Sequence, residues 1–172
     1  MSISREKTAI VTGSNTGIGL ECARQLLDLG LSKLILAVRN EDKGHHAREN
    51  LLSTQAPSLP DGTIEVGKLD ICVYDTMTAF AKRAESLERL DIVILDAAVC
   101  KQTHEVVPAT GHEEMLQVNV LSTALLAILL LQALKAKNTP EEPGRIAWVQ
   151  SDTASWAKFK NKDCHTPPTS FG

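Results

Sequence analysis

The stretch that decides the fold reads Thr12-Gly13-Ser14-Asn15-Thr16-Gly17-Ile18-Gly19. It follows a short apolar run and precedes a segment whose apolar side chains recur at helical spacing. A glycine-rich turn between a strand and a helix lets the backbone approach a phosphate, whose charge the helix N-terminus stabilises. The pattern therefore predicts a loop that holds the pyrophosphate of a dinucleotide, with the side chains at positions 14, 15 and 16 as extra donors. A tight turn without a ligand is the alternative, which the flanking strand and helix make less favoured.

Outward from this loop, short apolar runs alternate with longer helical segments, as is typical of a parallel sheet built from β-α-β units. Strands are predicted at residues 8–11, 34–38, 63–66, 92–95 and 145–149, each buried on both faces. Helices are predicted at residues 17–29, 41–54, 74–89 and 111–137. In the first helix, the face predicted to pack on the sheet carries Ile18, Cys22, Leu26 and Leu29.

The bulk composition favours a single domain that works inside the cell. The chain has 172 residues, 43% of them hydrophobic, and a net charge of −3, so nucleic acid is not an expected partner. Its four cysteines form no Cys-x-x-Cys pair and have no histidine at metal-ligand spacing, so we expect no metal site. The first seven residues are too charged for a signal peptide, which predicts a cytoplasmic location.

Two further segments are interpreted from their composition. The apolar stretch 118–134 falls short of the ~20 residues that a membrane span needs, so a buried helix is expected and a membrane is not. Residues 1–156 are predicted to form the nucleotide-binding domain, and the polar residues 157–172 a disordered tail.

The second predicted strand ends at Arg39, about 20 residues beyond the loop, where a dinucleotide fold distinguishes NAD from NADP. An acidic residue there binds the ribose hydroxyls of NAD, whereas an arginine favours the 2′-phosphate of NADP. The planar guanidinium of Arg39 suits bidentate phosphate binding, so NADP (NADPH) is the predicted cofactor. The alternative is a solvated arginine at a strand end.

Together these features resemble the short-chain dehydrogenase/reductase family, whose Thr-Gly-x-x-x-Gly-x-Gly motif is complete at residues 12–19. The resemblance implies a three-layer Rossmann-type fold with strand order 3-2-1-4-5, incomplete relative to the seven-stranded family fold. It implies cofactor contacts from Asp70 and Ile71 after the third strand, where the family aspartate binds the adenine amino group. A helix-capping role is the alternative for Asp70. Asp96 and Ala98 stand where the family usually has Asn-Asn-Ala-Gly.

The resemblance also implies two catalytic residues. Asn119 matches the asparagine of the family's catalytic tetrad, and Ser151 matches the serine that hydrogen-bonds the substrate carbonyl or alcohol. Residues 155–159 resemble the extended loop of fungal members. The family's Tyr-x-x-x-Lys motif does not occur in the chain, whose one tyrosine, Tyr74, has Thr78 at the lysine position.

The predicted function is hydride transfer between NADPH and a small-molecule carbonyl, or the reverse oxidation of an alcohol. The alternative is a catalytically inactive member that binds only nucleotide or a partner protein. Substrate identity and any homo-oligomeric state are left open by the sequence.

Overall fold

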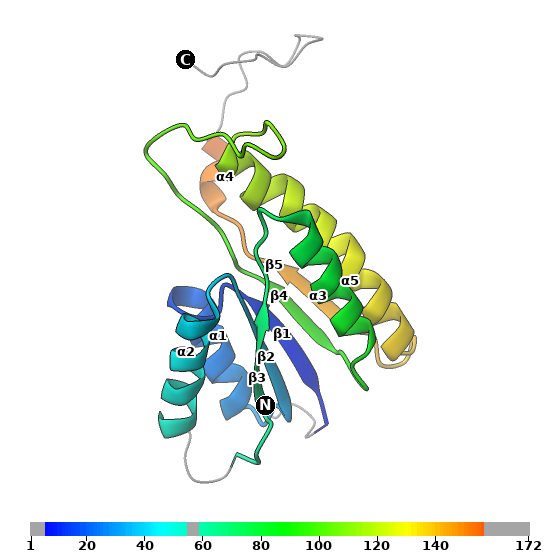
Figure 1. Cartoon of the computed structure of the whole chain (residues 1–172). Coiled ribbons are helices and arrows are strands. Elements are labelled where there is room, and N and C mark those ends of the chain that lie inside the picture. The colour runs from blue at the N-terminus through cyan, green and yellow to red at the C-terminus, as the bar shows by residue number, and fades with distance from the viewer. Residues whose placement is uncertain (1–5, 55–58, 157–172) are drawn as a thin grey trace.

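The computed structural model describes residues 6–54 and 59–156. Its strands form one parallel sheet in which neighbours follow the order β3-β2-β1-β4-β5 (Figure 1). The described strands are β1 (Thr8–Thr12), β2 (Lys33–Val38), β3 (Ile64–Lys68), β4 (Ile92–Leu95) and β5 (Arg145–Trp148). This sheet confirms the predicted α/β class and strand order. The expected disordered tail, residues 157–172, lies outside the described residues.

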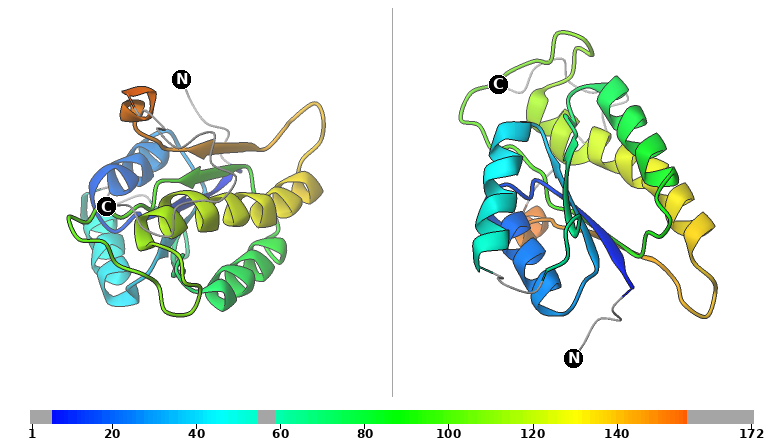
Figure 2. Two further views of the ribbon diagram at one scale, coloured as in Figure 1. Left: turned by 90° about the horizontal axis from the view of Figure 1, so that it is seen from above. Right: turned by 60° about the horizontal axis from the view of Figure 1, so that its bottom comes forward.

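Helices cover the sheet on both faces and complete three layers (Figure 2). One layer holds α1 (Gly17–Asp28) and α2 (Glu41–Thr54), and the other holds α3 (Tyr74–Glu85) and the long final helix. Successive strand side chains point to opposite faces, so Ile10 packs in the α3 layer while Ala9 and Val11 pack in the α1 layer. The central strands are therefore buried on both faces, as predicted.

The face of α1 that packs on the sheet differs from the predicted one. Its buried residues are Gly19, Ala23, Leu26 and Leu27, whereas Ile18 is 63% exposed. The buried set keeps the spacing of an amphipathic helix but is rotated by one residue from the predicted set. Two of its members are small, which lets the first turns of the helix lie close to the sheet.

The last strand also departs from its prediction. Arg145, Ile146 and Ala147 of β5 are exposed, and only Trp148 is half-buried. In the described part of the chain β5 is the end strand of the sheet, so it lacks the neighbours that bury β1 and β2.

The predicted final helix, residues 111–137, is three consecutive pieces that begin three residues later. They are α4 (Glu114–Leu116), a π-helical segment η1 (Gln117–Ser122) and α5 (Thr123–Lys137). Glu113 caps the start, because its carboxylate accepts the N–H of Leu116 at 2.7 Å. By length and composition alone, the 24 residues could cross a membrane, which corrects the estimate that the stretch is too short. One side packs on the sheet through residues such as Leu126 and Leu130.

Candidate functional site

A cleft of about 1030 Å³ lies at the carboxyl ends of the neighbouring strands β1 and β4. The chain leaves these neighbouring strands in opposite directions across the sheet, which is the position where open α/β sheets bind ligands. Apart from Ser14 and Gly19, every predicted site residue lines this cleft: Gly13, Asn15, Thr16, Gly17, Ile18, Arg39, Asp70, Ile71, Asp96, Ala98, Asn119 and Ser151. The fold therefore brings together residues that are up to 138 positions apart in sequence, the difference between 13 and 151.

The loop before α1 has the geometry of a phosphate cradle. Gly13 and Gly17 have φ angles of 67° and 61°, which favour glycine. A Cβ on Gly13 would lie 2.9 Å from the Cα of Ala97, and one on Gly19 would lie 2.8 Å from the carbonyl oxygen of Gly13. The side chain of the N-cap residue Thr16 makes no capping hydrogen bond, so it leaves the helix N-terminus to a ligand.

The side chain of Ser14 does not supply a donor to the cleft. Its side chain is fully buried, and its Oγ donates a hydrogen bond to the carbonyl oxygen of Val11 at 2.8 Å. The chain turns back at Gly13, which directs the serine into the protein, so the predicted donor role is wrong. Gly19 is buried beneath the loop, where its lack of a side chain permits the close approach to Gly13.

Arg39 lies at the rim of the cleft, directly after β2. Its side chain is exposed, and no carboxylate of the described residues forms an ion pair with it. The amine of Lys68 donates to its carbonyl oxygen at 2.7 Å and fixes the backbone there. The guanidinium is thus available to an anion at this rim of the cleft.

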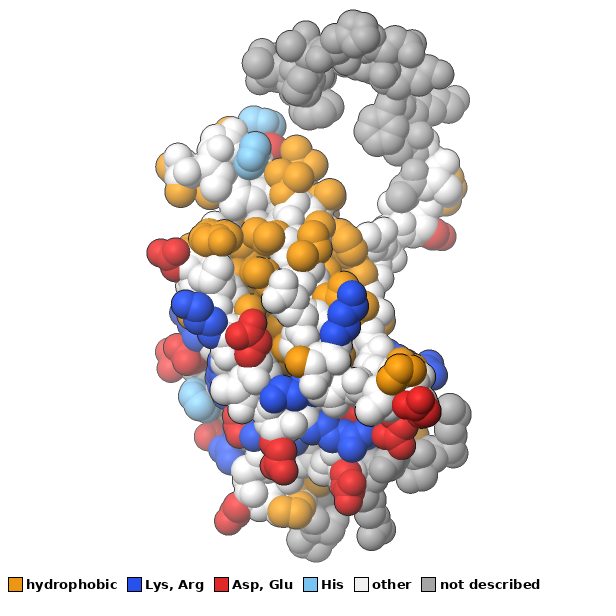
Figure 3. Space-filling model, turned by 90° about the vertical axis from the view of Figure 1, so that its right-hand side faces the viewer, with side chains coloured by type: hydrophobic (Ala, Val, Ile, Leu, Met, Phe, Trp, Pro, Cys, Tyr) orange, Lys and Arg blue, Asp and Glu red, His pale blue; other side chains and the backbone are white. Residues whose placement is uncertain are grey.

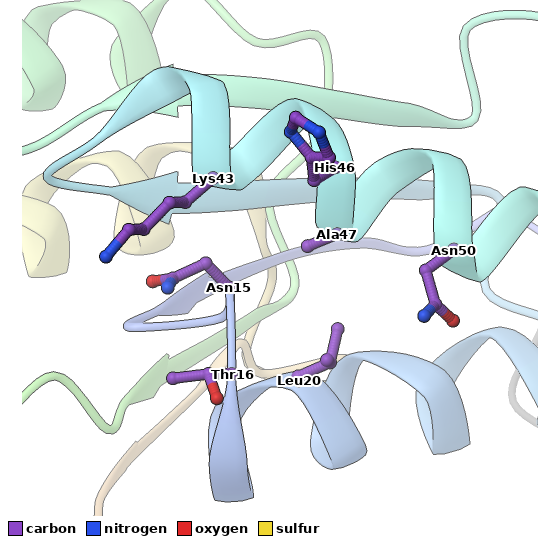
Figure 4. Close-up of a pocket in the computed structure, with 7 residues that line it drawn as sticks. All are labelled: Asn15, Thr16, Leu20, Lys43, His46, Ala47 and Asn50. Carbon is purple, nitrogen blue, oxygen red and sulfur yellow. The ribbon is translucent and has the colours of Figure 1, made fainter.

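A second pocket, of about 450 Å³, adjoins the cleft between α1 and α2. It shares Asn15 and Thr16 with the cleft and adds Lys43, which extends from the first turn of α2 toward Asn15 (Figure 4). Lys43 also has no ion-pair partner among the described residues. Sequence reasoning missed Lys43. The signal that could have found it is its position one helical turn after Arg39, at the start of the predicted second helix.

Asp70 holds the turn after β3. Its Oδ1 accepts the N–H of Cys72 at 3.0 Å, whereas α3 begins after Val73 without a side-chain cap. The helix-cap alternative is therefore wrong, and the aspartate instead forms a local turn that leaves it in the lining of the cleft.

Asp96 follows β4 at the floor of the cleft. The buried Thr12 Oγ1 accepts the N–H groups of Asp96 and Ala97, each at 3.0 Å. The Asp96 carboxylate accepts the N–H of Gly19 in the first turn of α1. Burial raises the pKa of Asp96, and the hydrogen bond from Gly19 partly opposes that rise.

Asn119 and Ser151 both line the cleft. The amide of Asn119 is bidentate on Val99, with Oδ1 accepting its N–H at 2.9 Å and Nδ2 donating to its carbonyl at 2.8 Å. The exposed Ser151 Oγ lies 2.8 Å from Thr153 Oγ1 and accepts the Thr153 N–H at 3.2 Å. Among the described residues, no hydrogen bond joins Asn119 to Ser151 directly, and Tyr74 does not line the cleft.

Comparisons with known proteins agree with this geometry. The family model described as short chain dehydrogenase matches residues 7–161. The short-chain dehydrogenase fogG of Aspergillus ruber is 49% identical over 156 residues, which are 91% of this chain and 44% of that protein. The short chain dehydrogenase/reductase mfmJ of Annulohypoxylon moriforme is 50% identical over 159 residues, 92% of this chain and 45% of that protein.

Solved structures give the same picture. The Pseudomonas aeruginosa RhlG/NADP active-site complex aligns at a TM-score of 0.65 and 26% identity, over 83% of this chain and 52% of that one. The menthone neomenthol reductase from Mentha piperita, at 23% identity, shares the fold at a TM-score of 0.70 over 87% of this chain and 62% of that one. The chain spans about half the length of the curated relatives that it matches. With its loop, cleft and family match in agreement, the chain belongs to the short-chain dehydrogenase family of oxidoreductases.

Proposed function

We propose that the chain binds NADPH and takes part in hydride transfer between this cofactor and the carbonyl or alcohol carbon of a small molecule. The observation that carries the proposal is that Arg39 and Lys43, two cations with no ion-pair partner in the described part of the chain, line the pockets that share Asn15 and Thr16. A dinucleotide whose pyrophosphate lies on the glycine loop would bring a 2′-phosphate to these cations. The RhlG structure from Pseudomonas aeruginosa, at 26% identity, is a complex with NADP, which supports the same choice of cofactor.

The described residues fit such a cofactor. The crowded approach at Gly13 leaves room for backbone amides to meet a phosphate but not for a side chain. Asp70 and Ile71 line the cleft on the side of Arg39 and would hold the adenine, while Asn119 and Ser151 line its opposite part. The bound cofactor would supply the hydride chemistry.

The chain's own residues would orient the substrate. The hydroxyl of Ser151 is exposed to the cleft and can donate to a substrate oxygen, while Thr153 holds the Oγ in place. Asn119 fixes the loop after β4 through both hydrogen bonds to Val99, and so keeps the wall of the cleft in position. Orienting the substrate speeds the reaction because it removes the entropy cost of aligning the reacting atoms.

A cofactor titration tests the proposal. Trp148 lines the cleft, so quenching of its emission should report nucleotide binding. A charge-assisted hydrogen bond contributes ~1.5–3 kcal/mol, so we expect NADPH to bind about tenfold or more tightly than NADH. Arg39→Ala should remove most of that preference and Lys43→Ala a part of it, with NADH affinity little changed.

The matched control is Lys82→Ala, which removes an exposed lysine from α3, outside both pockets. It should leave both affinities unchanged. Equal affinities of the wild-type chain for NADPH and NADH, or a preference that survives the double variant of Arg39 and Lys43, would contradict the assignment of NADP.

A further inference from the structure

A carboxylate lies directly beneath the loop that would receive the cofactor's phosphates. Asp96 accepts the N–H of Gly19, and a Cβ on that glycine would lie 2.9 Å from Asp96 Oδ2. The carboxylate therefore touches the first turn of α1, and Asp96 lines the same cleft as Gly13, Gly17 and Ile18. The N-terminus of α1, which would attract a phosphate, therefore already has the negative charge of Asp96 beside it.

The charge of Asp96 is not neutralised by a nearby cation. Among the described residues, no lysine, arginine or histidine forms an ion pair with it. The titratable neighbour on α1 is Cys22, whose thiol pKa is raised by its own burial and further by the charge of Asp96. Thr12 on β1 holds only the backbone of Asp96, and Asn119 on the facing helix is uncharged.

We propose that Asp96 sets the strength of nucleotide binding in this chain: its carboxylate anchors the glycine loop through Gly19 and, by its charge, repels the pyrophosphate that the loop holds. This inference rests on the proposed function. A like charge at less than a Debye length in a half-buried cleft changes affinity by about tenfold. An asparagine at this position would keep an oxygen acceptor for Gly19 and remove the repulsion.

If Asp96 repels the pyrophosphate, nucleotide affinity should depend on pH. A bound pyrophosphate would disfavour the ionised carboxylate, so binding would favour uptake of a proton by Asp96. Nucleotide affinity should therefore rise as the pH falls toward the raised pKa of Asp96. NADH is the probe for this profile, because it lacks the 2′-phosphate, which itself titrates near neutral pH. His46 lies in the adjoining pocket, and a His46→Gln variant removes its imidazole from the comparison.

The test compares the wild-type chain with Asp96→Asn and Asp96→Ala, using the emission of Trp148 to follow NADH and NADPH. At pH 8 we expect Asp96→Asn to bind both nucleotides about tenfold more tightly than wild type. Asp96→Ala should bind less tightly than Asp96→Asn, because it removes the acceptor for Gly19 as well as the charge. The wild-type affinity for NADH should be higher at the acid end of the pH range in which the chain stays folded than at pH 8, whereas that of Asp96→Asn should stay flat and His46→Gln should keep the wild-type slope.

Three results overturn the inference. They are an Asp96→Asn variant that binds no more tightly than wild type, a pH profile that the variant retains, and a profile that disappears with His46→Gln. If wild type binds NADPH and Asp96→Asn gains nothing, this inference alone fails. If neither protein binds either nucleotide, the proposed function fails with it. Should Asp96→Asn not fold, as judged by circular dichroism, the wild-type and His46→Gln profiles decide.

Discussion

Gly13 and Gly44 are both packed too closely for a side chain, but they meet different neighbours. A Cβ on Gly13 would meet the backbone of Ala97 at the floor of the cleft, and its φ of 67° is itself unfavourable for other residues. A Cβ on Gly44 would lie 2.7 Å from the side chains of Val38 and Val66, where α2 packs on the sheet. Only the first glycine therefore bears on the phosphate site.

We expect Gly13→Val to abolish nucleotide binding, because a β-branched side chain at this positive φ would collide with the backbone of Ala97 and displace the loop proposed to hold the pyrophosphate. The measurement is the same NADPH titration. A suitable control is Gly62→Ala, because Gly62 also has a positive φ, of 83°, yet a Cβ there would meet nothing within 4 Å. Gly44→Ala, by contrast, would perturb helix packing. Binding by a folded Gly13→Val variant would refute the phosphate-loop assignment.

For single residues, the sequence predicts which residue types form a site better than it predicts where their side chains point. The glycine spacing and the position of Arg39 are local features, and the structure places both at the cleft. The inward direction of Ser14 depends on the turn at Gly13, and the reach of Lys43 depends on how α2 lies beside α1. Neither packing relation is encoded in a local pattern.

Among the elements, η1 shows how a polar side chain shapes a helix. Asn119 sits in this π-helical segment and is held by Val99 through both ends of its amide. Thr123 Oγ1 donates to the carbonyl of Val118 at 2.6 Å across the same turn. Such π-helical turns occur often at functional sites, and here the segment directs Asn119 to the cleft.

Asn119→Ala should lower the free energy of unfolding by about 2–3 kcal/mol, because it leaves the N–H and C=O of Val99 without their partners in a half-buried site. Asn119→Asp keeps an acceptor but loses the donor, so its effect should be smaller. Urea unfolding measures both values. Gln132→Ala, which removes an exposed amide from the same helix, should cost less than about 0.5 kcal/mol. An Asn119→Ala variant as stable as Gln132→Ala would show that the bidentate contact contributes nothing.

The sequence pattern predicts the positions of helices and strands better than their local form or burial. Apolar periodicity placed strands within about two residues of their observed positions and matched α2 at both ends. It could not show the π-helical segment, which depends on a side chain meeting a distant loop. It could not show the exposure of β5 either, since burial depends on what packs over a strand rather than on the strand's own residues.

In the molecule as a whole, the final helix has apolar side chains on its exposed side as well as on the side that packs against the sheet. Leu126 is fully buried against the sheet, whereas Ile128, two residues later, is 62% exposed. Leu121 and Leu131 on the same helix are exposed as well. Figure 3 shows hydrophobic side chains gathered in the upper part of the face that it draws, above a charged lower part. Clustered exposed apolar groups are unusual on a soluble monomer and lower solubility.

A pair of charge substitutions tests this division. Ile128→Lys should change the free energy of unfolding by less than about 0.5 kcal/mol and reduce binding of a hydrophobic dye, because it adds a charge to exposed apolar surface. Leu126→Lys should unfold the chain, because it would bury an unpaired ammonium. Urea unfolding and dye fluorescence measure the two effects. Equal destabilisation by both substitutions would contradict the packing of this helix.

Turnover depends on more than the cleft. Reduction of a carbonyl needs a hydride, a donor to the developing alkoxide and a proton, and the 172-residue chain offers Ser151 and Asn119 but no Tyr-x-x-x-Lys. A neutral serine is a poor acid without a partner of suitable pKa, and loss of a positioned acid/base group costs about 10²–10⁴ in rate. Water could deliver the proton, but Ser151 is exposed at an open end of the cleft and would not alone hold a carbonyl in a reactive geometry.

We therefore expect the 172-residue chain to oxidise NADPH at or near background with a panel of aldehydes and ketones, even where it binds the cofactor. Robust turnover that Ser151→Ala abolishes would disprove this expectation and reveal a proton donor elsewhere, with His165, outside the described residues, the first to replace.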